Sequence, residues 1–185
     1  MKRFLLIIGS VFALLMPTRA YADIIFTPFA GVTFGGDAPS SKFNWGGNVT
    51  LMGAVVGIEL DFGYSPNFFN QDTGTAVISD SNVVTLMGNL IVGVGRGPFR
   101  PYVSGGLGLL RSDVEAGTLF DTNSVNDFGF NVGGGVFMFF TKHFGIRGDI
   151  RYFRSLLDPS DDNDLDVFLG SIDFWRGVGG VSFKF

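Results

Sequence analysis

The amino-acid sequence predicts an all-β fold, an eight-stranded antiparallel up-and-down β-barrel that spans a membrane. Three observations indicate it: strict alternation of apolar and polar residues near the C-terminus, seven earlier segments of similar character, and an export leader at the N-terminus. Successive side chains on a strand point to opposite faces, so alternation separates an apolar face from a polar one. Lipid outside and a small polar interior would satisfy both faces.

The last segment, residues 172–185, has the clearest alternation. Its odd positions include Trp175, Gly177, Gly179, Val181, Phe183 and Phe185, and its even positions include Arg176, Val178, Gly180, Ser182 and Lys184. One face is therefore apolar with aromatic ends, and the other is small or polar. A strand of this kind that ends in a terminal Phe is typical of a transmembrane barrel.

The N-terminus has the features of a secretory signal peptide. A basic start precedes an apolar run over residues 4–16, and the motif Ala20-Tyr21-Ala22 offers a small-x-small cleavage site. The apolar run is too short for a convincing membrane span, which disfavours an uncleaved anchoring helix. We therefore expect residues 1–22 to be removed and residues 23–185 to form the barrel.

Composition excludes several other classes of protein. The chain has no cysteine, so it has no disulfide, no thiolate metal site and no lipoprotein attachment site. The formal net charge of −4 becomes −7 without Lys2, Arg3 and Arg19 of the leader, which disfavours nucleic acid as a partner. Beyond the leader, the best apolar run, residues 128–140, is shorter than the ~18 residues of a membrane helix and is interrupted by glycines and Asn131.

The first three strands are expected before residue 65. Residues 24–34 alternate well, although Pro28 cannot donate to a ladder and predicts a bulge or a locally unpaired position. A polar loop over residues 35–46 precedes a short second strand, residues 47–53. The third strand, residues 58–64, has Ile58, Leu60, Phe62 and Tyr64 outward and Glu59, Asp61 and Gly63 inward.

Five further strands complete the barrel. They are expected over residues 82–94, 100–111, 127–140, 145–154 and 172–185. Their outward residues include Leu86 and Leu90, Val103 and Leu107, Phe128 and Phe130, and Ile146 and Ile150. Strands of about ten residues cross a thin bilayer at the tilt of a barrel.

The connections are expected to alternate between long and short, with extended external loops at one rim and tight periplasmic turns at the other. The long loops cover residues 35–46, 65–81, 112–126 and 155–171. Aromatic residues expected at the membrane interfaces are Tyr64, Phe99, Tyr102, Phe140, Phe144, Tyr152, Trp175 and Phe185. A soluble barrel of the lipocalin type would bury its apolar face, so the polar inward face favours a membrane barrel.

Several segments together resemble the family of small outer-membrane β-barrel proteins that includes OmpA and OmpX. They are the leader, residues 27–36 (TPFAGVTFGG), 59–66 (ELDFGYSP), 100–106 (RPYVSGG) and 181–185 (VSFKF). The resemblance implies a Gram-negative-type outer membrane and insertion by the barrel-assembly machinery, with Phe185 as the recognition signal. It specifies a fold and no activity. Unlike the larger OmpA proteins, this chain is expected to stop at the barrel, without a peptidoglycan-binding domain.

Charged residues on the inward faces of three strands form a candidate lumen network. Its expected members are Glu59, Asp61, Arg147, Asp149, Arg151 and Arg176. The third and seventh strands lie opposite each other in an eight-stranded barrel, so these side chains should meet across the interior. Because unpaired buried charges cost several kcal/mol, the simplest role is a structural salt-bridge plug. A gated small-ion conductance is the alternative, since charged rings select ions when a network rearranges.

Motifs for catalysis or cofactor binding are scarce, so we expect no enzyme, no catalytic residue and no cofactor. His143, the only histidine, lies in a turn, with no serine or carboxylate nearby in the sequence to form a nucleophile–base pair. Gly133-Gly134-Gly135 lies within a strand and lacks the following helix and lysine of a phosphate-binding loop. A lipid-modifying enzyme is therefore the least favoured function.

The last long loop contains an acidic cluster. Asp162, Asp164 and Asp166 have the spacing of a calcium loop, but Val167 stands where the turn-making glycine is needed and the bidentate glutamate is absent. We therefore expect no metal site; loose divalent-cation binding by these weak candidates is the alternative to a solvated acidic loop. Either form could share bridging cations with anionic lipopolysaccharide.

Together these features predict a monomeric, envelope-stabilising or adhesive surface protein whose long loops form the contact surface. A narrow channel is the alternative function, and planar-bilayer conductance distinguishes the two. The expected partners are outer-membrane lipid, lipopolysaccharide and the assembly machinery, together with an extracellular ligand that the sequence does not identify.

Overall fold

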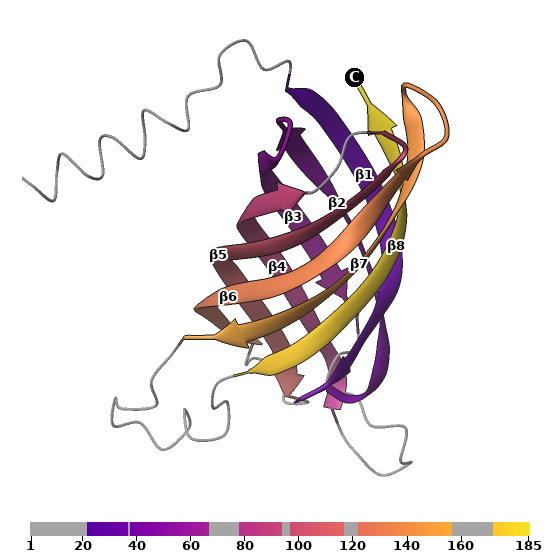
Figure 1. Cartoon of the computed structure of the whole chain (residues 1–185). Coiled ribbons are helices and arrows are strands. Elements are labelled where there is room, and N and C mark those ends of the chain that lie inside the picture. The colour runs from indigo at the N-terminus through magenta and orange to yellow at the C-terminus, as the bar shows by residue number, and fades with distance from the viewer. Residues whose placement is uncertain (1–21, 37, 67–77, 94–96, 117–121, 157–171) are drawn as a thin grey trace, which may run out of the picture.

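The computed structural model describes residues 22–36, 38–66, 78–93, 97–116, 122–156 and 172–185. Within them, eight antiparallel strands form a closed barrel in which sequence neighbours pair and β1 also pairs with β8 (Figure 1). This result confirms the predicted fold class. No helix in this part of the chain is long and apolar enough to cross a membrane.

The barrel has two different ends. Its strands are β1 (Asp23–Gly35), β2 (Ala38–Met52), β3 (Val56–Ser65), β4 (Ile78–Gly93), β5 (Phe99–Ala116), β6 (Thr122–Phe139), β7 (Phe144–Ser155) and β8 (Asp173–Lys184). Residues 53–55, 94–98 and 140–143 connect strands at one end, where β1 also begins and β8 ends; we call this the short-turn end. The opposite rim, with the β3–β4 and β7–β8 connections, is the loop end.

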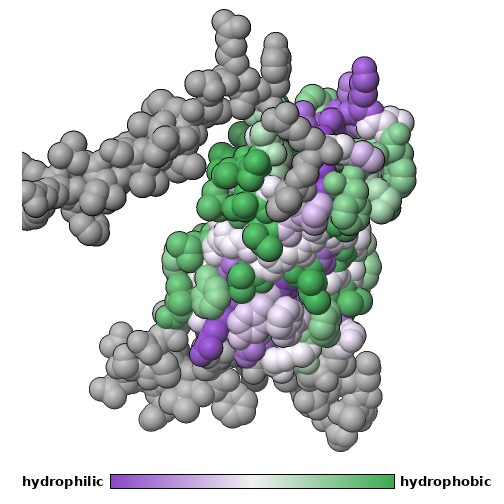
Figure 2. Space-filling model, in the orientation of Figure 1, coloured by the Kyte–Doolittle hydropathy of each residue, from purple (hydrophilic) through white to green (hydrophobic). Residues whose placement is uncertain are grey.

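Burial alternates along the strands as the sequence pattern predicts. In β3, Ile58 and Leu60 are 59% and 57% exposed, whereas Glu59 and Asp61 are 4% and 0% exposed. A closed barrel has no sheet edge, so every strand presents one face to the lumen and one to the surroundings. Figure 2 shows apolar residues distributed along the height of the visible outer face, with strongly hydrophilic residues at its upper tip and others among them lower down.

The expected loop over residues 35–46 is wrong for most of its length. β2 already begins at Ala38, and Phe43 and Trp45 point outward opposite Val32 and Ala30 of β1. Polar residues and the glycine pair near the middle of β2 resemble a loop in composition. However, backbone pairing with β1 does not depend on side-chain polarity, so the strand continues through them.

Two other expected loops are shorter than predicted. Within residues 112–126, β5 continues to Ala116 and β6 starts at Thr122, and their backbones pair up to Glu115 opposite Thr122. Within residues 65–81, β4 begins at Ile78. The hydrophobic pattern marks only the part of each strand that faces hydrocarbon, because pairing beyond that band does not require apolar side chains.

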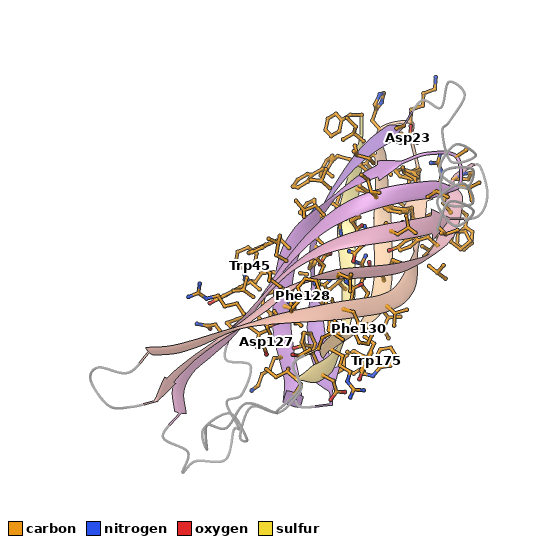
Figure 3. The ribbon with its side chains drawn as sticks, turned by 90° about the vertical axis from the view of Figure 1, so that its left-hand side faces the viewer. Asp23, Trp45, Asp127, Phe128, Phe130 and Trp175 are labelled. Atoms are coloured by element: carbon orange, nitrogen blue, oxygen red, sulfur yellow. The ribbon has the colours of Figure 1, made fainter. Side chains whose placement is uncertain are left out.

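Aromatic side chains gather on the outer wall near both ends. Trp45 packs against Tyr64 and Trp175 against Tyr152, with ring centroids 5.6 and 5.3 Å apart, respectively. Figure 3 shows Trp45, Phe128, Phe130 and Trp175 nearer the loop end, with Asp23 at the opposite end. The expected interfacial position of Tyr102 is wrong, because its side chain points into the lumen and is 5% exposed.

Two sequence-based expectations concern residues that the structure does not describe, and a third concerns Phe185, the last residue of the chain. Residues 1–21 of the expected signal peptide lie outside the described residues, as do Asp162, Asp164 and Asp166. Phe185 follows β8, is 76% exposed, and donates its backbone N–H to the Ile24 carbonyl at 2.9 Å. Its role as an assembly signal stays a prediction.

The charged lumen as candidate functional site

Six charged side chains from β3, β7 and β8 point into the lumen. They are the residues predicted from sequence: Glu59, Asp61, Arg147, Asp149, Arg151 and Arg176. Because the strand period is two, each follows an outward residue and is turned inward. The structure brings all six into one continuous network of ion pairs.

Glu59 is the centre of this network. Its Oε2 accepts a hydrogen bond from Arg147 Nη1 at 2.5 Å, and its Oε1 lies 2.8 Å from Arg151 Nη2. Strands on both sides of β3 add neutral donors: Thr50 Oγ1 donates to Oε2 at 2.9 Å, and Asn89 Nδ2 donates to Oε1 at 3.1 Å. These four partners compensate for the removal of the carboxylate from water.

Asp149 bridges the two arginines of β7, and Tyr102 contacts both Asp149 and Arg147. Asp149 Oδ2 accepts from Arg147 Nη2 and from Arg151 Nη2, both at 2.8 Å. Tyr102 Oη donates to the same oxygen at 2.8 Å and accepts from Arg147 Nε at 2.6 Å. The Arg147 guanidinium also lies 4.9 Å from the Tyr102 ring centroid and 4.8 Å from that of Phe137. Arg147 is therefore held by charge, hydrogen bonds and aromatic faces together.

Asp61 and Arg176 extend the network toward the loop end. Arg176 Nη2 donates to Asp61 Oδ1 at 2.8 Å, while Arg151 Nη1 lies 3.8 Å from Asp61 Oδ2. The Arg176 guanidinium lies 4.9 Å from the Phe29 ring centroid and 4.7 Å from that of Phe153. Such contacts are worth about 2 kcal/mol when water is excluded, so apolar neighbours also stabilise this cation.

The network is balanced in charge and shielded from solvent. Three guanidinium groups face three carboxylates, and each of these side chains is at most 2% exposed. The formal charges cancel, so the network as a whole does not favour ions of one sign. An ion entering the lumen would have to break existing pairs.

Two apolar layers lie on either side of the network. The loop-end layer consists of Ala38, Val83, Met87, Leu110, Phe153, Ile172 and Phe174, and the short-turn layer consists of Ile25, Met52, Ile91, Tyr102, Phe137 and Phe139. Phe153 stacks on Phe174 with centroids 5.1 Å apart, and Phe137 on Phe139 at 5.9 Å. In the described residues, the charged network thus lies between two mainly apolar clusters. Each cluster also has buried polar neighbours, such as Ser65 opposite Val83 at the loop end and Thr50 opposite Ile25 at the short-turn end.

Sequence reasoning missed the neutral partners of the network. Besides Tyr102, Thr50 and Asn89, Asn48 accepts a hydrogen bond from Arg147 Nη1 at 2.7 Å. Alternation along the strand predicts their inward direction, because each of them stands next to an outward apolar residue, such as Val49 on β2. An aromatic residue near a strand end also fits an interfacial belt, so the position of Tyr102 along the chain does not by itself predict that it points inward.

The described residues show no assembled catalytic or metal centre. His143 is exposed in the β6–β7 turn, where its backbone N–H donates to Thr141 Oγ1 at 3.3 Å. No group of three or more His, Asp or Glu side chains in this part of the chain is arranged to hold a metal ion. The inward charged residues Glu59, Asp61, Arg147, Asp149, Arg151 and Arg176 pair with one another.

Comparisons with known proteins agree with this architecture. Residues 13–173 match the family described as outer membrane protein beta-barrel domain. The structure is similar to Neisserial surface protein A (TM-score 0.66, 15% identity, 90% of this chain and 99% of that chain). It is also similar to the N-terminal β-barrel domain of Pseudomonas aeruginosa OprF (TM-score 0.58, 18% identity, 90% of this chain and 100% of that chain). A third similar structure is Ail, the attachment invasion locus protein of Yersinia pestis (TM-score 0.55, 12% identity, 88% of this chain and 97% of that chain). A sequence search of curated proteins found no match.

Proposed function

This chain belongs to the outer-membrane β-barrel domain family, and we propose that it is a closed barrel with a structural or surface-interacting role in the outer membrane. The observation that carries the proposal is the neutral ion-pair network between two apolar layers. A barrel filled in this way holds its external segments in place, and an ion entering it would have to break buried ion pairs. No catalytic role is proposed.

Planar-bilayer recording of the refolded barrel, residues 23–185, tests the closed lumen. We expect no steady single-channel steps above those of a bilayer that received detergent alone. Steps of reproducible size would overturn the closed lumen and favour the narrow ion channel instead. A band shift on unboiled gels would verify that the recorded protein is folded.

The charges of the outer wall support an orientation in the membrane. Among the described strand side chains that point outward, only Arg111, Arg154 and Asp173 are charged, and all three lie near the loop end of their strands. Short turns of barrels in this class face the periplasm, so the loop end faces the exterior. The charged positions then lie at the outer boundary of the hydrocarbon.

We propose that Arg111 and Arg154 contact phosphate groups of lipopolysaccharide. They lie on either side of β6, which presents Phe128 outward between them at 51% exposure. Guanidinium groups bind phosphate through paired, charge-assisted hydrogen bonds. The aromatic ring between them would pack against the apolar part of the same lipid.

Charge reversal of both arginines tests this contact. We expect the variant Arg111→Glu with Arg154→Glu to bind lipopolysaccharide more weakly than the unmodified barrel in detergent, measured by thermal stabilisation at rising lipid concentration. Lys142→Glu, in an exposed short turn, is the matched control and should bind normally. Equal stabilisation of all three proteins, or the same response to dephosphorylated lipopolysaccharide, would contradict the proposal.

Export through a cleaved leader and assembly through Phe185 complete the proposed function. β1 begins at Asp23, directly after the expected cleavage site, and Asp23 Oδ2 lies 3.1 Å from Arg100 Nη1. Deletion of Phe185 is expected to lower the amount of assembled barrel in cells while leaving the thermal stability of the refolded barrel nearly unchanged. Normal assembly of this variant would show that Phe185 is not an assembly signal.

A further inference from the structure

A groove of about 610 Å³ lies on the outer wall over β2, β3 and β4, which are consecutive in the barrel (Figure 1). Its sides are the outward residues Val49, Leu51, Ile58, Leu60 and Leu90. Gly88 of β4 contributes to the floor, together with parts of Glu59 and Asn89, whose buried side chains belong to the lumen. The groove is therefore a depression in the outer face of the single β-sheet that forms the barrel wall.

The groove depends on the missing side chain of Gly88. Gly88 is an outward position between Leu86 and Leu90, and it pairs with Leu60 on one side and Leu107 on the other. A Cβ placed there would approach only the Leu107 carbonyl oxygen, at 3.8 Å. No backbone constraint therefore requires glycine, and the neighbouring leucines rise around an open space.

The position of the groove along the barrel axis identifies a leaflet. Leu51, Ile58 and Leu90 lie close to the short-turn ends of their strands, next to residues 53–55 and 94–98. The short-turn end faces the periplasm, so the groove opens into the inner leaflet. The groove is continuous with the apolar wall, and its outward lining side chains are all aliphatic.

We propose that this groove binds one acyl chain of an inner-leaflet glycerophospholipid and holds it longer than the lipid around the rest of the barrel. A void between leucine side chains loses dispersion contacts unless it is filled, and water cannot fill an apolar site favourably. A methylene group is about as large as a water molecule, roughly 30 Å³, so the groove has room for one chain. The inference rests on the membrane-embedded barrel and is independent of whether the lumen conducts.

Filling the groove tests the proposal, with a matched control on the opposite wall. Gly88→Ala and Gly88→Leu fill it in two steps, whereas Gly148→Leu adds the same side chain at another open outward position, on β7, where a Cβ meets nothing within 4 Å. Each barrel is refolded, embedded in vesicles of phosphatidylethanolamine, extracted in mild detergent and weighed by native mass spectrometry. We expect one retained phospholipid on the unmodified barrel and on Gly148→Leu, less on Gly88→Ala and loss on Gly88→Leu.

Three outcomes would overturn the proposal. Phospholipid retained equally by Gly88→Leu would show that the groove does not hold it, and loss from Gly148→Leu as well would show a general effect of added bulk. A mass of two barrels that disappears in Gly88→Leu would assign the groove to a second copy of this chain. Conductance of the unmodified protein would overturn the closed lumen, but it would not change the phospholipid masses that test the groove.

Discussion

At the residue scale, the lumen is stable because each buried charge has several partners. Arg147 alone contacts Glu59, Asp149, Tyr102 and Asn48, so its removal would leave two carboxylates short of a cation. Losing one member of a buried ion pair is more harmful than never having buried the pair, because the remaining charge stays desolvated. The network is therefore best probed one arginine at a time.

Arg147→Ala and Arg151→Ala should each destabilise the barrel by about 3 kcal/mol or more, because each leaves buried carboxylates without a full set of partners. The measurement is urea unfolding in detergent micelles, followed by tryptophan fluorescence. Arg154→Ala, on the outer wall, is the control and should change stability by less than about 1 kcal/mol. Unchanged unfolding of both lumen variants would show that the network does not act as a stabilising salt-bridge plug.

Tyr102→Phe isolates the hydroxyl that bridges Asp149 and Arg147. The ring and its contact with Arg147 stay, while two hydrogen bonds are lost, so we expect a loss of about 1–3 kcal/mol. Tyr152→Phe is the matched control, because its hydroxyl binds Asp173 on the half-exposed outer wall and should matter less. A larger effect for Tyr152 than for Tyr102 in the same unfolding assay would contradict the buried role of Tyr102.

At the scale of single strands, β2 is the element whose local sequence predicts a loop where the structure has a strand. Gly46 and Gly47 are adjacent, yet a Cβ on Gly46 would collide with the Phe62 carbonyl oxygen of β3, whereas a Cβ on Gly47 would come no closer than 3.6 Å to the Thr27 carbonyl oxygen. The two positions face opposite sides of the sheet, because they are consecutive in a strand. The close approach at Gly46 arises from the pairing of β2 with β3, so it would be absent if these residues formed a loop.

Gly46→Ala should therefore destabilise the barrel by about 1–3 kcal/mol through overpacking. Gly47→Ala should change stability by no more than about 0.5 kcal/mol, since the added methyl group meets ordinary contacts. Heat-induced loss of the band shift on gels compares the two variants directly. Equal midpoints for the pair would argue that residues 38–46 form a loop after all.

The sequence predicted the strands where the alternation is set by hydrocarbon on one side, as in β3, with Ile58 and Leu60 outward and Glu59 inward. It could not predict the ends of β2, β5 and β6, because polar side chains beyond the hydrocarbon read equally well as strand or loop. The charged members of the lumen network can be predicted from the inward direction of alternate residues and from the number of strands. Their neutral partners need the cross-strand register, which places Thr50 and Asn89 beside Glu59.

At the scale of the whole molecule, the barrel reverses the polarity of a soluble domain. Charged side chains that form ion pairs with one another fill its middle, and apolar side chains such as Val103 at 64% exposure cover its outside. Such a surface is stable only where hydrocarbon replaces water, which agrees with the outer-membrane family to which the chain belongs. We therefore expect lipid to contact the outer wall.

Tryptophan quenching tests that claim most directly, because the chain has two tryptophans, Trp45 and Trp175, and both point outward at 48% and 41% exposure. The refolded barrel would be placed in vesicles whose lipids carry bromine on their acyl chains, and separately in ordinary vesicles with iodide in the water. We predict strong quenching by the brominated lipids and weak quenching by iodide. Strong quenching by iodide with none from the lipids would show that the outer wall contacts water, as would a folded monomer that stays in solution without detergent.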